Sequence, residues 1–73
     1  MELMMQFFDA DTLEEKLGII QKMEVLEEID DHVIDNLAAT LDVVIDDGDI
    51  QKRTDDLKHC LRMRMKYETA RFR

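Results

Sequence analysis

The sequence has no proline, no tryptophan and only two glycines, Gly18 and Gly48, among its 73 residues. Proline and glycine are the residues that most strongly mark turns, and a sheet of many strands needs many turns. Their scarcity therefore argues against an all-β fold. The rest of the chain is rich in Leu, Met, Glu, Lys and Arg, which favour helices. We predict an all-α protein.

Cysteine is nearly absent as well. Cys60 has no second cysteine to pair with, so an internal disulfide is excluded, which suits a reducing compartment. The N-terminal stretch carries acidic residues where a secretion signal needs basic ones. No apolar run approaches the roughly 20 residues of a membrane-spanning helix. We therefore expect a cytoplasmic protein that does not cross a membrane.

The sequence also lacks the usual patterns of catalytic and metal sites. His59 and Cys60 pair a base with a nucleophile, but adjacent residues of a helix point about 100° apart. Together with His32 they lack the paired spacing of zinc ligands. In the DDGD stretch, with Gly48 at the glycine position of a calcium loop, only Asp47 falls at a ligand position. We expect no enzyme activity, no cofactor and no metal.

Charge is abundant and is separated along the chain. Residues 1–50 hold fifteen acidic residues against two lysines, a net charge of −13, whereas residues 51–73 hold eight bases against three acids, a net of +5. Such a separation indicates either a basic surface for nucleic acid or an acidic partner, or two parts of one fold that neutralise each other.

The spacing of apolar residues predicts three helices, at 12–29, 31–46 and 50–71. Thr12 opens a capping-box pattern that marks the start of the first. Apolar residues then recur in steps of three up to Ile29 and in steps of four afterwards, so one straight helix would swing its apolar face round and back. We predict a break or strong bend near Asp30 and Asp31, where an aspartate can cap a new helix. A single continuous helix is the alternative.

Gly48 is expected to end the second helix in a left-handed conformation, and Asp49 is expected to cap the third. The two helices would then fold back on each other. In that antiparallel hairpin Arg62 would lie opposite Asp35, and Lys66 opposite Asp31, so the basic residues would neutralise the chain's own aspartates.

The predicted fold is an antiparallel helical hairpin within a small three-helix bundle. A single domain of 73 residues buries only a marginal core, and association is a common remedy. We therefore expect a homodimer, in which two chains form a larger helical bundle.

Two apolar surfaces are candidates for partner binding. One lies in the N-terminal segment, residues 1–10, and the other on a second face of the helix at 50–71. For each, the alternative is burial within the chain's own bundle or a twin subunit; the N-terminal segment also has disorder as an alternative. The residues are Leu3, Met4, Phe7 and Phe8 in the first surface, and Cys60, Met63, Tyr67 and Ala70 in the second.

These features predict a small acidic protein-binding module that regulates, links or antagonises a larger protein and associates with itself. The alternative function is association with nucleic acid through the basic C-terminal helix. The residues for that alternative are Arg53, Arg62, Arg64, Lys66, Arg71 and Arg73.

Overall fold

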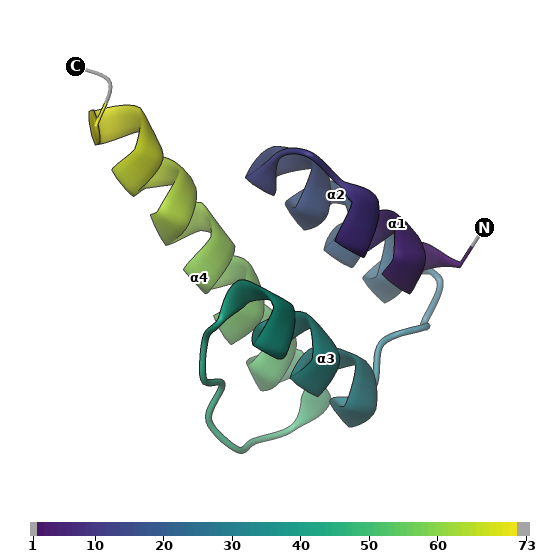
Figure 1. Cartoon of the computed structure of the whole chain (residues 1–73). Helices are drawn as coiled ribbons and strands as arrows, with labels where there is room; N and C mark the ends of the chain where they lie inside the picture. The colour runs from purple at the N-terminus through teal and green to yellow at the C-terminus, as the bar shows by residue number, and fades with distance from the viewer. Residues whose placement is uncertain (1, 72–73) are drawn as a thin grey trace.

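The computed structural model describes the backbone of residues 2–71 and the side chains of residues 2–68. It contains four helices: α1 (Leu3–Asp9), α2 (Leu13–Val25), α3 (Asp31–Leu41) and α4 (Ile50–Arg71) (Figure 1). No strand occurs between residues 2 and 71. The prediction of an all-α protein is confirmed.

Three of the four helices, α2, α3 and α4, begin at a polar side chain that caps them, whereas Glu2 makes no such bond at the start of α1. The Thr12 hydroxyl accepts a hydrogen bond from the Glu15 backbone N–H at 3.1 Å. The Asp30 carboxylate accepts one from the Val33 N–H at 2.9 Å, and Asp49 caps α4 in the same way. Each cap satisfies an amide that has no partner within its own helix. The predicted break at Asp30 is therefore confirmed.

The helix ends differ from the prediction. α2 ends at Val25 instead of residue 29, and α3 ends at Leu41 instead of residue 46. The residue that ends α3 is Asp42, with φ of 57° and ψ of 46°, and Gly48 has no positive φ. The assignment of Gly48 as the left-handed residue was wrong, because aspartate can also adopt this conformation.

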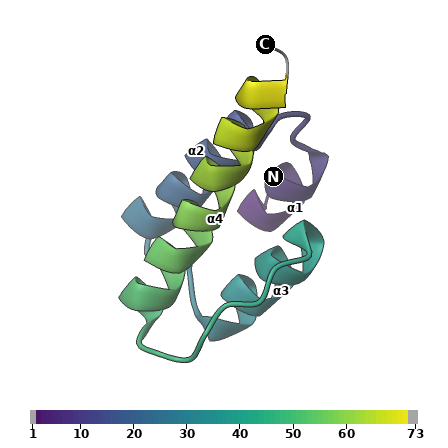
Figure 2. The ribbon, with the colours of Figure 1, turned by 90° about the vertical axis from the view of Figure 1, so that its left-hand side faces the viewer.

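α3 and α4 run in the same general direction, which corrects the predicted antiparallel hairpin (Figures 1 and 2). Asp31 at the start of α3 pairs with Arg53 in the first turn of α4, and the Leu41 carbonyl at the end of α3 accepts from Arg64. The connection, residues 42–49, spans up to about 26 Å at 3.3 Å per residue, whereas the 11 residues of α3 rise only about 16 Å. The chain can therefore return to the start of α3 before α4 begins.

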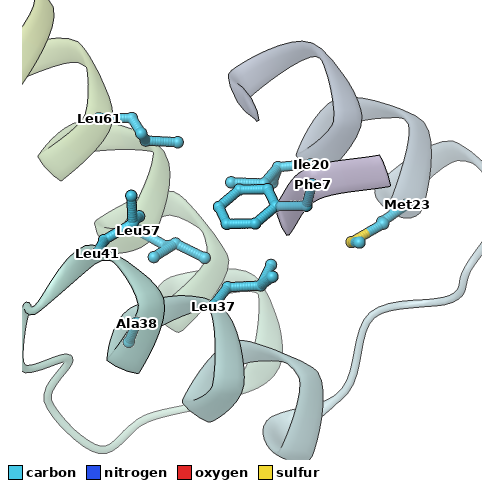
Figure 3. Close-up of a cluster of buried hydrophobic side chains, with 8 residues drawn as sticks. All are labelled: Phe7, Ile20, Met23, Leu37, Ala38, Leu41, Leu57 and Leu61. Atoms are coloured by element: carbon cyan, nitrogen blue, oxygen red, sulfur yellow. The ribbon is translucent and has the colours of Figure 1, made fainter. Parts of the chain in front are cut away.

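The antiparallel neighbour of α4 is α2 (Figure 2). All four helices contribute to the core, and the Phe7 ring points into its centre from α1 (Figure 3). The core residues are Phe7, Ile20, Met23, Leu37, Ala38, Leu41, Leu57 and Leu61.

α1 is held in place by Lys16 of α2. The Lys16 ammonium donates to the Phe7 carbonyl at 2.7 Å and lies 4.7 Å from the centre of the Phe7 ring. The first contact satisfies a carbonyl at the end of α1, and the second is a cation–π interaction. The N-terminal segment is thus an integral part of the bundle.

Candidate interaction surfaces

Arg53 lies between α4 and α3 and is only 8% exposed. Its two terminal nitrogens each lie 2.7 Å from a carboxylate oxygen, one of Asp31 and one of Asp35. The two aspartates are four residues apart and share one face of α3, so a single guanidinium bridges both. Hydrogen bonds to Asp35 and Asp31 raise the pKa of Arg53 above its ordinary value. The guanidinium is therefore occupied by the chain's own carboxylates.

A raised pKa also fixes the sign of the pH dependence. Folding favours the charged form of Arg53. While Asp31 and Asp35 are ionised, its stabilising effect is therefore complete at pH values below the pKa of Arg53 in the unfolded chain. The effect is lost only as the pH rises through the folded-state pKa. The two ion pairs of Arg53 are therefore not weakened when the pH rises within the physiological range.

Two further bases of α4 are engaged within the bundle. The Lys58 ammonium lies 2.8 Å from a carboxylate oxygen of Glu24 in α2 and 3.6 Å from one of Asp55. The Arg64 guanidinium donates to the Leu41 carbonyl. Basic residues of α4 thus neutralise or cap other parts of the chain, but these residues are Arg53, Lys58 and Arg64. The sequence had predicted Arg62 and Lys66.

Arg62 and Lys66 are exposed, and within the described side chains neither forms an ion pair. Their expected partners, Asp35 and Asp31, bind Arg53 instead, because α3 and α4 are parallel and the register differs. Of the other predicted nucleic-acid residues, Arg71 and Arg73 lie outside the described side chains. Only Arg62 and Lys66 are therefore seen as available cations of that set.

The last part of α4 extends beyond the bundle. Leu61 is the last fully buried residue among the described side chains of α4, and residues 62–71 are here called the α4 end. Arg64 still contacts the end of α3, whereas the helix beyond it extends past the other helices in the view of Figure 1. Met63 is 37% and Tyr67 68% exposed, and Cys60 is half-buried. The side chain of Ala70 lies outside the described residues. Met63 and Tyr67 of the predicted second face are thus accessible to a partner.

The predicted N-terminal surface is mostly used by the core. Phe7 is fully buried, and Leu3 and Met4 are half-buried against the core cluster. Phe8 is 41% exposed. The expectation that these four residues form one accessible patch is corrected for Phe7, since the segment folds over its own bundle and places that ring inside.

A second surface, which the sequence did not single out, lies on the outer side of α2. A shallow groove of about 490 Å³ is lined by Gly18, Gln21, Lys22, Val25 and Leu26, here called the α2 groove. Val25 is 82% exposed and Leu26 58%. The sequence carries no local signal for this surface, because adjacent apolar residues such as Ile19 and Ile20 can both pack on the core.

The residues of possible catalytic or metal chemistry are not brought together. His59 is exposed, and the His32 ring contacts Asn36 one turn later in α3 at 3.3 Å. The described part of the chain holds no group of three or more His, Cys, Asp or Glu arranged to bind a metal ion. None of its helices combines the length and the apolar character needed to cross a membrane.

Comparisons of the chain with protein-family models, with curated proteins and with solved structures found no match.

Proposed function

We propose that this chain is a small protein-binding module, acting as a regulator, adaptor or antagonist of a larger protein, and that its contact surface is the α4 end. The observation that carries the proposal is the exposure of Met63 and Tyr67 on a helix that continues for ten residues past Leu61, the last fully buried residue among its described side chains. Helices of this length owe most of their stability to packing of an apolar face. A partner would supply that packing.

The residues of the α4 end suit a protein surface. Tyrosine is among the residues that most often carry binding energy, and methionine adapts its shape to irregular surfaces. Arg62 and Lys66 flank Met63 and Tyr67 in sequence and have no ion pair among the described side chains. Such a border favours a partner with acidic residues around an apolar centre.

Recovery of the tagged protein from its native host, with mass analysis of what is bound, tests this proposal. The variant Met63→Ser/Tyr67→Ser is expected to lose a partner that the wild type retains, by about tenfold or more, because both exposed side chains become small and polar. Val44→Ser is the matched control, since Val44 is 92% exposed in the connection before α4. Equal recovery with all three proteins, or no partner with the wild type, would refute the proposal.

The alternative function, association with nucleic acid, rests on Arg62 and Lys66, which form no ion pair with the side chains of residues 2–68. Arg53 is bound to two aspartates, and the whole chain carries a net charge of −8. A phosphate backbone approaching the α4 end would therefore meet a repulsive acidic body.

We expect no retention of the protein on DNA or RNA, even at low salt. Phosphate contacts release counterions, so binding through the α4 end would weaken steeply with salt, by about one power of the salt concentration per phosphate contact. Retention measured across a salt series checks this expectation. Binding at low salt that disappears with such a slope, and that is lost in Arg62→Gln/Lys66→Gln, would favour the alternative instead.

A further inference from the structure

We propose that the α2 groove is the docking site for the α4 end of a second copy of this chain, so that two chains form a reciprocal dimer. This inference rests on the proposed function, because it names one partner for the same surface. Four observations support it: two apolar surfaces of matching character, an open position at Gly18, opposite charges at their borders, and the direction in which the α2 groove faces.

The two surfaces are apolar and both are uncovered. Val25 and Leu26 are strongly exposed in the α2 groove, and Met63 and Tyr67 are exposed on the α4 end. Burying both sets in one contact removes apolar area from water, which is the main favourable term in association. A reciprocal pair buries each surface twice, once in each copy.

Gly18 creates the room in the groove. A Cβ placed at Gly18 would have no atom within 4 Å, so the backbone of α2 is open to solvent there. A residue without a side chain allows another chain to approach the helix backbone closely. An exposed aromatic ring such as that of Tyr67 fits a position of this kind.

Acidic residues beside the α2 groove complement the cations of the α4 end, whereas Lys22 is the one charged residue in the lining of the groove itself. Glu14 and Glu15 are exposed in the first turn of α2, and they precede Gly18 by four and three residues, which places them one turn along the same side of the helix. Arg62 and Lys66 border the apolar residues of the α4 end. A contact between two α4 ends would instead bring these cations together, which is unfavourable.

The groove cannot be filled by the chain's own α4. Ile20 of α2 is fully buried in the core, and Gly18 and Lys22 lie about 160° away from it at 100° per residue. The groove therefore faces away from α4 of the same molecule. A second copy brings its α4 end to the groove without any change in the fold.

Sedimentation equilibrium of the purified full chain, over a wide range of protein concentration at low and high salt, tests the dimer. We expect a reversible dimer that weakens as salt rises. Tyr67→Ala and Gly18→Leu are each expected to weaken it by about tenfold or more. Gly18→Leu gives the clearer test of the two. The leucine side chain fills the groove, and the open space around Gly18 accommodates it. Leucine also favours a helix more than glycine does, so the variant should remain folded. Val44→Ala should dimerise like the wild type.

Charge exchange separates docking from a general loss of structure. Arg62→Glu/Lys66→Glu and Glu14→Lys/Glu15→Lys should each weaken the dimer. Mixing the two variants should restore both reciprocal contacts, one with the original charges and one with the charges exchanged. A dimer unaffected by Gly18→Leu, or no recovery on mixing, would overturn the assignment of the groove. A wild type that stays monomeric throughout would overturn self-docking, while a partner lost on Met63→Ser/Tyr67→Ser would still uphold the proposed function.

Discussion

Phe7→Ala is expected to lower the free energy of unfolding by about 3–5 kcal/mol, the usual result of removing a large aromatic side chain from a packed core. Phe7 is fully buried, and its ring lies in the centre of the core cluster (Figure 3). A domain of this size has a total stability of only about 4–11 kcal/mol at the usual 0.05–0.15 kcal/mol per residue. The variant should therefore be partly or wholly unfolded at room temperature, which urea denaturation followed by far-ultraviolet circular dichroism would show.

Phe8→Ala is the matched control. The two rings are neighbours in the chain and lie edge to face with centroids 6.2 Å apart, but Phe8 is 41% exposed. Its removal is expected to cost about 1 kcal/mol or less, mostly through the lost contact between the rings. Similar losses for both variants would contradict the assignment of Phe7 to the core, and so would an unaltered stability of Phe7→Ala.

The N-terminal segment illustrates why sequence alone left two interpretations open. α1 has only seven residues, and so short a stretch shows that one side is apolar without showing what covers it. The contact that decides the matter is nonlocal: Lys16 of the next helix binds the Phe7 carbonyl and ring. Nothing in the spacing of residues 1–10 predicts this bond.

The starts of the helices were predictable because their causes are local. Thr12, Asp30 and Asp49 each bind an amide three residues later, and these side chains are visible in the sequence. The end of α3 was not predictable, because apolar residues continue at helical spacing past Leu41. Val43 and Ile45 still pack against the core, but from the connection instead of from a helix.

The direction of α4 depends on that one helix end. If α3 ran to residue 46, a tight turn at Gly48 would make the two helices antiparallel. With α3 ending at Leu41, the connection is long enough for a parallel arrangement, and the choice of ion pairs follows from it. The sequence indicated that basic residues of the last helix would neutralise aspartates. Which base does so depends on how α4 is aligned with α3, and in this fold it is Arg53.

Of the candidate surfaces, the face of α4 that carries Met63 and Tyr67 was predictable from periodicity, since these residues fall away from the stripe of Leu57 and Leu61. The α2 groove was harder to predict. Its apolar residues, Val25 and Leu26, lie at the end of α2, where the sequence predicted a helix that continued to residue 29. The steps of three placed Leu26 on the apolar stripe of that helix.

Leu57→Ala is expected to lower the free energy of unfolding by about 2–5 kcal/mol. Leu57 is fully buried in the core cluster and joins α4 to the rest of the bundle. The core cluster to which it belongs contains side chains from all four helices, so collapse around the missing side chain is restricted. For a domain of this size the loss corresponds to a decrease in Tm of about 10 °C or more, which thermal unfolding followed by circular dichroism would measure.

Met63→Ala, one and a half turns further along α4, is the control that separates stability from binding. Met63 is 37% exposed and has no place in the core cluster, so its replacement should change the free energy of unfolding by only about 0.5 kcal/mol. The same variant should weaken partner binding, whereas Leu57→Ala should affect binding only as far as it unfolds the chain. A large loss of stability with Met63→Ala would mean that the α4 end is packed within the monomer, and the contact surface would then have to lie elsewhere.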